Sequence, residues 1–309
     1  MNEIIVLGSA NMDLVVRQPR LPHPGETIFG LAFTTVPGGK GLNQAVAAAR
    51  AGASVSFLGA VGRDVFGSEL RDCLQQDDID VQGLQDVDVN TGTAHVSVLD
   101  GGENAIVVVP GANDSITALN NHAKRQIRGA RFLLAQFERP TALILEAFRL
   151  AKEAGVTTVL TPAPVREIEK ELMKLVDVLV PNAHEACALA GVSDEETAAT
   201  SLSRSVGLVV MTRGSRGALV TRGGEVIHTV RALPARAVDT TAAGDTFVGA
   251  LVAMMAEGMP LERALSAATA AASISVTRDG ASTSMPTRAE ILEVTGLEYT
   301  RRVHAELGP

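Results

Sequence analysis

The chain has 309 residues, of which 46% are hydrophobic and 20% are charged, which allows a large buried core and excludes the disordered and fibrous classes. The 35 acidic residues outnumber the 27 basic ones, for a net charge of −8, and no run of Lys and Arg forms the basic face that nucleic acid requires. We therefore expect no nucleic acid among the partners.

Apolar, β-branched runs alternate with segments of helical periodicity along most of the chain. This pattern is typical of βαβ units and of a parallel sheet covered on both faces, so we predict an α/β main domain. Strands are predicted over residues 4–7, 55–59, 132–136, 158–160, 178–180 and 208–211. Helices are predicted over residues 41–51, 141–154 and 247–256.

Two stretches, 13–36 and 91–110, break this rhythm and show the alternation of consecutive strands. Ala94, Val96 and Val98 share one face of such a strand. A small antiparallel sheet could lay that face over a pocket on the main domain. We predict that these two stretches form a β-sheet lid. The predicted main domain comprises residues 1–12, 37–90 and 111–309.

Asn11 and Asp13 directly follow the first strand, where an open parallel sheet presents its strand ends to ligands. They alternate onto one face. A carboxylate beside an amide suits adjacent sugar hydroxyls, although both residues are also ordinary turn residues.

A glycine loop at residues 37–44 opens the first helix. It is not a Walker A loop, because Gly41 follows Lys40 where Ser or Thr is required, and it is not the dinucleotide fingerprint. The glycines could let a polyhydroxylated ligand reach backbone N–H groups, with Lys40 and Asn43 as side-chain donors. A tight turn followed by a helix cap explains this segment equally well.

Small residues lead from a loop directly into the predicted helix 247–256. Unpaired N–H groups at a helix start favour an anion, and Ala242, Ala243 and Gly244 let a phosphate approach the backbone closely. Asp245 could accept a proton from a substrate hydroxyl there. A helix cap is the alternative, and it would be preferred for an isolated Gly-Asp pair.

The two cysteines, Cys73 and Cys187, lie far apart without a paired-spacing motif, so neither a disulfide framework nor a zinc site is expected. The N-terminal run shows no signal-peptide pattern, and the longest apolar stretches are too short to span a bilayer. We expect a cytoplasmic protein without a membrane partner.

Taken together, these segments resemble the ribokinase (PfkB-type) carbohydrate kinase family, from the first strand to about Thr287. Residues 37–62 resemble the family's first signature and residues 237–249 its second. Residues 181–185 match its Asn-x-x-Glu motif. The resemblance implies a three-layer αβα sandwich around a mostly parallel sheet with a small β-sheet lid, and an ATP-dependent kinase that acts on a small sugar.

Within the family, these motifs are most similar to those of ribose kinases, so the implied acceptor is the O5 hydroxyl of D-ribose. Asp245 would be the general base, with Ala242, Ala243 and Gly244 as the anion hole. The residues implied to hold the sugar are Asn11, Met12, Asp13, Gly39, Lys40, Gly41, Asn43, Glu138 and Asp245.

The resemblance also implies a nucleotide site and two cations. Asn182 would face the phosphates, and Glu185 would organise Mg²⁺ through water. The residues implied to bind ATP are Asn182, Thr212, Arg213, Gly214, Ser215, Arg216, Gly217 and Gly244. We expect K⁺ activation. The implied K⁺ ligands, mostly backbone oxygens, are Asp239, Thr241, Ser275, Arg278, Gly280 and Ser284.

Other acceptors remain open, namely 2-deoxyribose, fructose, a nucleoside of the pseudouridine type or a sugar phosphate. With 3% aromatic residues and no Trp, the lid lacks a platform for a base, and it has no Lys or Arg between residues 91 and 110 to hold a sugar phosphate. A non-catalytic sugar-binding protein on the same fold is a further alternative. A dehydrogenase is disfavoured by the missing dinucleotide fingerprint.

Because lid strand edges would be exposed in a monomer, we expect a homodimer joined through the lid.

Overall fold

A central nine-stranded sheet organises the molecule, with strand order β13-β12-β11-β10-β9-β8-β1-β4-β5. The computed structural model describes residues 3–101 and 103–296. All strands from β11 to β5 in that order run parallel, and β12 and β13 are added antiparallel at one edge. The strands are β1 (Ile4–Leu7), β4 (Val55–Gly62), β5 (Leu84–Val87), β8 (Phe132–Gln136), β9 (Thr157–Thr161), β10 (Val178–Leu179), β11 (Leu208–Thr212), β12 (Ala218–Arg222) and β13 (Glu225–Val230).

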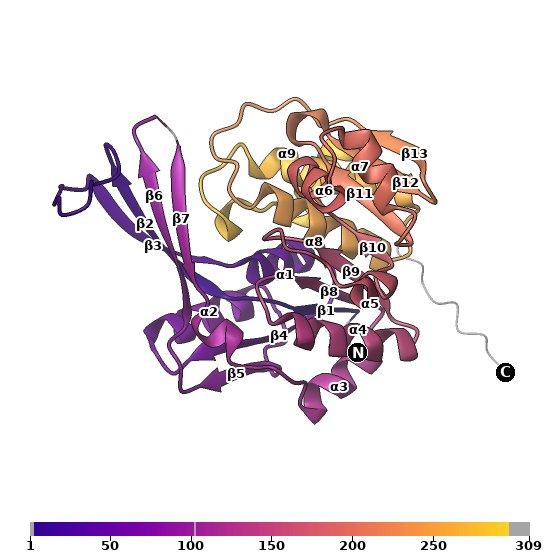
Figure 1. The fold of residues 1–309 in the computed structure, drawn as a ribbon, viewed down its shortest axis with the longest axis horizontal. Helices are drawn as coiled ribbons and strands as arrows, with labels where there is room; N and C mark the ends of the chain where they lie inside the picture. Colours follow the sequence, from indigo (N-terminus) through magenta and orange to yellow (C-terminus); the bar gives the residue numbers. More distant parts are fainter. Residues whose placement is uncertain (1–2, 102, 297–309) are drawn as a thin grey trace.

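Helices cover both faces of this sheet, which confirms the predicted three-layer αβα sandwich (Figure 1). One layer consists of α1 (Lys40–Arg50), α2 (Val65–Gln76), α8 (Ala243–Ala256), α9 (Leu261–Ser275) and α10 (Arg288–Thr295). The other consists of α3 (Asn121–Arg128), α4 (Thr141–Glu153), α5 (Lys170–Lys174), α6 (Ala183–Ala190) and α7 (Glu195–Leu202). Short 3₁₀ turns η1 (Gly111–Asp114), η2 (Gly214–Arg216) and η3 (Ser282–Ser284) lie in the connections.

The continuous apolar runs of the central strands follow from this two-sided covering. In β1, Ile4 and Val6 pack into the core beneath α1 and α8, whereas Ile5 and Leu7 pack into the core beneath α4. Successive side chains of a strand point to opposite faces, so a strand with helices on both faces is apolar at nearly every position. This requirement explains why the ends of β1 and β8 coincide with the predicted ones.

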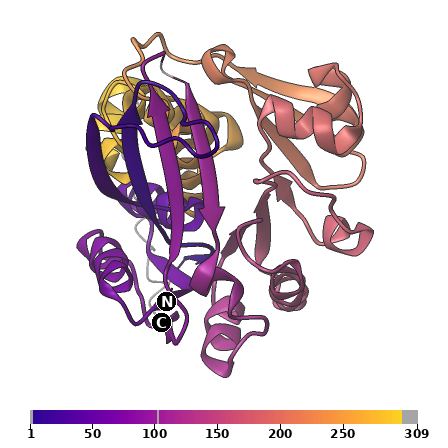
Figure 2. The same ribbon diagram turned by 60° about the vertical axis from the view of Figure 1, so that its left-hand side comes forward.

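Four strands form a second, smaller sheet that projects from the main body as a lid (Figures 1 and 2). The order is β3-β2-β6-β7. The strands are β2 (Asn11–Gln18), β3 (Ala32–Gly38), β6 (Gly92–Leu99) and β7 (Asn104–Val109). The expectation of an antiparallel sheet was wrong for the central pair, because β2 and β6 run parallel. Each belongs to a hairpin that leaves the main domain in the same direction.

Several further elements differ from the sequence prediction in their existence or in their bounds. The hairpin β12–β13 was not predicted, although its Gly223-Gly224 turn between two apolar runs is a hairpin signal. Helix α8 begins at Ala243 rather than at residue 247, and β4 continues to Gly62. The division of the chain into main domain and lid stays a prediction. Among the described residues, no helix has the length and apolar character to cross a membrane.

Candidate active site

The start of α8 presents unpaired backbone donors. Ala242, the residue before the helix, adopts a left-handed conformation with φ 58°, and its carbonyl accepts the N–H of Thr246 at 2.8 Å. The N–H of Ala243 donates to the carbonyl of Thr240 at 3.3 Å, whereas the N–H groups of Gly244 and Asp245 have no acceptor within the described chain. These two free donors, at the positive end of the helix dipole, can bind an anion.

The carboxylate of Asp245 lies in the first turn of α8, where the side chain is buried. Gln44 Nε2 donates to its Oδ1 at 2.8 Å, and Asn43 Nδ2 approaches Oδ2 at 3.4 Å. Burial raises the pKa of Asp245, and the charge of Lys40 and the bond from Gln44 oppose this rise. The group is therefore a stronger base than an exposed aspartate.

Near Asp245 lies a polar cluster supplied by the loop after β1, by the start of β2, by the start of α1 and by the residues after β8. Glu138 accepts the backbone N–H of Lys40 at 3.0 Å and the hydroxyl of Ser9. Burial, followed by the charges of Glu138 and Asp245, raises the pKa of Asp13 to about 7. Asp13, Glu138 and Lys40 thus lie close to one another, and two carboxyl groups with an ammonium group suit an acceptor with several hydroxyls.

Two glycines shape this cluster. A Cβ on Gly38 would lie 2.4 Å from Oδ2 of Asp13, so only glycine leaves room for that carboxylate. Gly39 precedes α1 with φ 91°, a conformation that favours glycine. Gly41 has a different role, because a Cβ there would lie 2.5 Å from the Cα of Gly8, in the contact between α1 and β1. Met12 is fully buried in the core, so its side chain faces away from the cluster.

Sequence reasoning missed three buried amides of this region. Asn113 in η1 donates to Oδ1 of Asn11 at 2.7 Å. Gln44 donates to Asp245, and Gln136 donates to Gln44. All three side chains are almost completely buried. Asn113 lies in a Pro-Gly-Ala-Asn-Asp run, which indicates only a turn, and the glutamines lie inside an apolar helix and strand. A polar residue at a position predicted to be buried was the only available signal.

A cavity of about 230 Å³ opens beside Asp245 and is bordered by Lys40, Thr161 and Glu185. The negative charge of Asp245 raises the pKa of Lys40, so this lysine stays protonated. The cavity therefore combines a cation, free N–H groups and a base.

Asn182 and Glu185 form a capping box at the start of α6, in which Asn182 Oδ1 accepts the N–H of Glu185 and Glu185 Oε2 accepts the N–H of Asn182, both at 2.8 Å.

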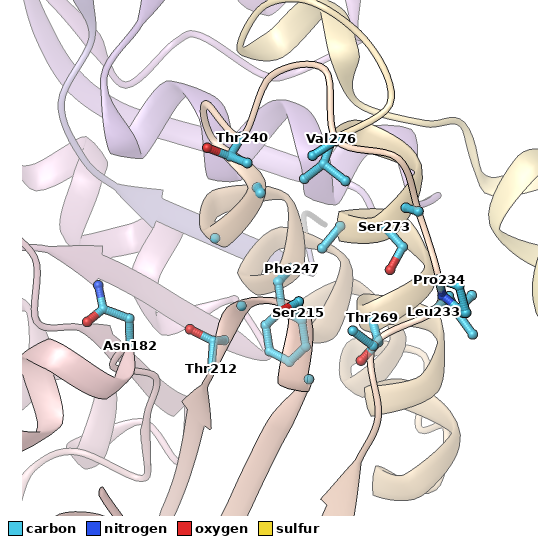
Figure 3. A pocket seen from close by; sticks show the side chains of 18 residues that line it. Asn182, Thr212, Ser215, Leu233, Pro234, Thr240, Phe247, Thr269, Ser273 and Val276 are labelled. Carbon is cyan, nitrogen blue, oxygen red and sulfur yellow. The ribbon is translucent and has the colours of Figure 1, made fainter. Parts of the chain in front are cut away.

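A second cavity of about 630 Å³ lies between the loop after β11 and helices α8 and α9. Figure 3 shows Asn182 and Thr212 at one end and Leu233, Pro234 and Thr269 toward the other. The predicted nucleotide loop contributes Thr212, Gly214, Ser215 and Gly217 to its wall. Arg213 and Arg216 are not among its lining residues, and Arg216 instead pairs with Glu195 at 2.6 Å.

The two cavities meet at the start of α8. Residues that border both of them are Asn182, Thr212, Thr240, Ala243 and Gly244. A ligand in the larger cavity can therefore extend a chain of phosphates past Gly244 toward Asp245. In the larger cavity, the buried hydroxyl of Thr269 has no partner in the described structure, which leaves it available to a ligand.

The residues implied as K⁺ ligands lie in two segments that Asp239 joins, except for Ser275, which is the last residue of α9. Oδ1 of Asp239 accepts the N–H and the hydroxyl of Thr241 at 2.8 and 2.6 Å, and Oδ2 accepts the N–H of Gly280 at 3.0 Å. The side chains of Ser275, Arg278 and Ser284 are engaged elsewhere. In the part of the chain that the structure describes, several of the six carbonyl oxygens accept no hydrogen bond, namely those of Asp239, Thr241, Arg278, Gly280 and Ser284. Such unpaired oxygens fit a hard cation.

Magnesium would be held less directly. No group of three or more His, Cys, Asp or Glu side chains is placed to hold a metal ion within residues 3–101 and 103–296. Glu185 borders the smaller cavity, and both of its carboxylate oxygens accept hydrogen bonds from Asn182. This arrangement fits Mg²⁺ that is held by phosphate oxygens and water, with Glu185 orienting the water.

Comparison with known proteins identifies the family. A model of the pfkB family of carbohydrate kinases matches residues 1–288. The chain is 41% identical to a ribokinase of Bacillus subtilis over 298 residues, which cover 95% of this chain and 99% of that protein. It is 39% identical to a ribokinase of Haemophilus influenzae, with coverage of 94% and 97%. The structure of Arabidopsis thaliana ribokinase complexed with ribose and ATP matches with a TM-score of 0.91 and 32% identity, covering 96% and 99% of the two chains. The chain belongs to the pfkB family of carbohydrate kinases.

Proposed function

We propose that this carbohydrate kinase transfers the γ-phosphoryl group of ATP to the O5 hydroxyl of D-ribose. The single observation that carries the proposal is the junction of two cavities at Gly244, with the carboxylate of Asp245 beyond it. The larger cavity has the size and the apolar side chains to take a nucleoside. The similarity to ribokinases, one of them solved with ribose and ATP, supports ribose as the acceptor.

Asp245 acts as the general base in this proposal. Its carboxylate takes the proton of the O5 hydroxyl as that oxygen attacks the γ-phosphorus, and the bond from phosphorus to the β–γ bridging oxygen breaks. The free N–H groups at the start of α8 and the protonated amine of Lys40 stabilise the charge on the transferred group. The raised pKa of Asp245 makes it a better proton acceptor.

The polar cluster beside Asp245 holds the sugar. Asn11 and Asn43 can donate to ribose hydroxyls, while Asp13 and Glu138 can accept from them. The cluster contains no aromatic platform for a base, which favours a free sugar over a nucleoside. Glu138 and the backbone of Lys40 are already bound to one another, so the acceptor groups are in place before ribose arrives.

Two cations complete the site in our proposal. Glu185 would orient water ligands of Mg²⁺, and the ion would supply neutralisation of phosphate charge. The loops that Asp239 joins would hold K⁺, which would stabilise the turn before α8 without touching the substrate. The role of the K⁺ site is therefore activation.

The lid also joins two copies of the chain in our proposal. Its outer strands expose large apolar side chains, among them Phe33 at 61% and Val107 at 64% exposed, beside Phe29 at 93% in the β2–β3 connection. The edges of β3 and β7 have no partner strand in the described sheet. A second lid would cover these edges and side chains.

Cys73 and Cys187 form no disulfide, in keeping with a cytoplasmic location.

The proposal is tested by measuring ADP release from Mg-ATP with ribose, 2-deoxyribose, fructose and a nucleoside, each with and without K⁺. Asp245→Asn should lower kcat by roughly 100- to 10,000-fold while ribose binding, measured by calorimetry, stays close to that of the wild type. Asp88→Asn, at a carboxylate that is 93% exposed, is the matched control. Full turnover by Asp245→Asn would refute the role of Asp245. Ribose binding without any ADP release by the wild type would favour a sugar-binding protein.

A further inference from the structure

Two buried glutamines, Gln44 and Gln136, form a chain of hydrogen bonds that ends on the carboxylate of Asp245. Gln44 Nε2 donates to Oδ1 of Asp245 at 2.8 Å and approaches the hydroxyl oxygen of Thr161 at 3.4 Å. Gln136 Nε2 donates to Oε1 of Gln44 at 2.6 Å. Both glutamine side chains are 0% exposed. The chain of hydrogen bonds therefore runs from Gln136 through Gln44 to Asp245, out of contact with solvent.

The order of these bonds determines which end of the Gln44 amide faces Asp245. Because the amide of Gln136 donates to Oε1 of Gln44, only the NH₂ group of Gln44 is left to face the carboxylate. The reversed amide would set its oxygen against the carboxylate oxygen, two acceptors without a proton between them. Gln136 belongs to strand β8 and Gln44 to helix α1, so rigid elements hold both members.

We propose that Gln44, oriented by Gln136, is a positioning residue that holds the Asp245 carboxylate in the geometry in which it receives the proton of the acceptor hydroxyl. This inference rests on the proposed role of Asp245 as general base. With Gln44 bound to Oδ1, the rotation of the carboxylate is restricted and Oδ2 is left on the side of Asn43. Neither glutamine borders the cavity beside Asp245, so Gln44 reaches that cavity through its bond of 2.8 Å to Asp245 and its longer contact of 3.4 Å with Thr161.

The bond from Gln44 also affects the protonation of Asp245. Donation to the ionised carboxylate lowers its pKa, against the effect of burial. The charged groups around Asp245 are Lys40, which favours the ionised form, and Glu138, Asp13 and Glu185, which disfavour it. A base acts only when ionised, so activity falls as the pH drops through its pKa. Removal of the Gln44 amide should move this acidic limb of the kcat profile to higher pH.

The test compares Gln44→Met and Gln136→Met with the wild type. Methionine has nearly the length of glutamine and no donor. We expect Gln44→Met to lower kcat by roughly 10- to 100-fold, with the KM for ribose changed by less than about 3-fold and the acidic limb shifted upward. Gln136→Met should change the same quantities in the same direction by a smaller factor. Gln126→Met, which removes an amide that binds Ser56 and Asp80 instead, is the matched control and should behave as wild type.

A double-mutant cycle sharpens the test, because Gln136 is proposed to act only through Gln44. In the Gln44→Met background, Gln136→Met should cause no further loss of kcat. Additive losses, or an unshifted acidic limb in both single variants, would overturn the proposal. If Gln44→Met does not fold, as judged by circular dichroism, the kcat of Gln136→Met and the acidic limb of its pH profile still test the proposal. Failure of the general-base role itself is seen separately, as turnover by Asp245→Asn.

Discussion

Asn113 donates a hydrogen bond from Nδ2 to Oδ1 of Asn11 at 2.7 Å, although 102 positions separate the two residues. The same side chain also exchanges hydrogen bonds with the backbone of Ala10, at 3.1 Å to its N–H and 3.2 Å to its carbonyl. The turn η1, which follows the last lid strand, is thereby tied to the loop that enters the first lid strand. The side chain of Asn11 is oriented by this contact.

Replacing Asn113 should weaken sugar binding. Asn113→Ala leaves Oδ1 of Asn11 and the Ala10 backbone without partners in a buried place, so we expect a loss of stability of about 1–3 kcal/mol. A misplaced Asn11 should raise the KM for ribose by roughly 10-fold, with a smaller effect on kcat. Steady-state kinetics and urea unfolding measure the two effects. Asn90→Ala, at an exposed side chain in the connection between β5 and β6, is the control, and an unaltered KM in Asn113→Ala would contradict the argument.

Asp13 should make the protein less stable as the pH rises. Its pKa is raised from 3.8 to about 7 in the folded state, chiefly by burial. Between these values the unfolded chain loses a proton that the folded chain keeps, so the free energy of unfolding decreases with rising pH and levels off above pH 7. Asp13→Asn removes this effect. Allowing for solvent screening of the partly exposed group, its stability relative to wild type should increase by about 1–2 kcal/mol between pH 5 and pH 8.

This gain is measured by urea unfolding at both pH values. Asp88→Asn, whose carboxylate is exposed, serves as the control. A difference from wild type that is the same at pH 5 and pH 8 in Asp13→Asn would show that the raised pKa is wrong. At pH 8, where Asp13 is ionised, the variant should also bind ribose more weakly, because it loses a charged acceptor of the sugar site.

Asp239 should govern the response to potassium. Its carboxylate joins the loops 239–241 and 278–284, so Asp239→Ala should separate the backbone oxygens that we assign to the cation. We expect the K⁺ concentration for half-maximal activation to increase by roughly 10-fold or more. Thermal stabilisation of the ligand-free protein by KCl, relative to tetramethylammonium chloride, should decrease in parallel. A variant that retains both responses would exclude these loops as the cation site.

The lid should control the oligomeric state. The double variant Phe33→Asp/Val107→Asp places charges on two exposed apolar positions of the outer strands, and we expect it to be monomeric where the wild type is dimeric. Light scattering at matched concentrations measures this change. Val294→Asp, at an exposed apolar residue of α10 in the main domain, should leave the dimer intact. A monomeric wild type would disprove lid pairing.

Most of the main domain could be predicted because its signals are local. A strand that is buried on both faces is apolar at nearly every position, as in β1 and in β8 up to Ala135, so both strands are recognisable from a few adjacent residues. The lid was recognisable as strands but not as a sheet of known pairing. The parallel contact between β2 and β6 depends on the direction in which two hairpins leave the main domain. No residue type in either strand indicates that direction.

The candidate site, like the fold, could be predicted from the sequence only in part. The sequence by itself determined the glycine loop at Gly39 and placed small residues and Asp245 near the start of α8, because a helix start depends on its own neighbouring residues. Only the tertiary structure decided which polar residues surround that carboxylate. Gln44 lies 201 positions from Asp245 and meets it because α1 packs against α8, a contact created by burying the apolar faces of both helices together.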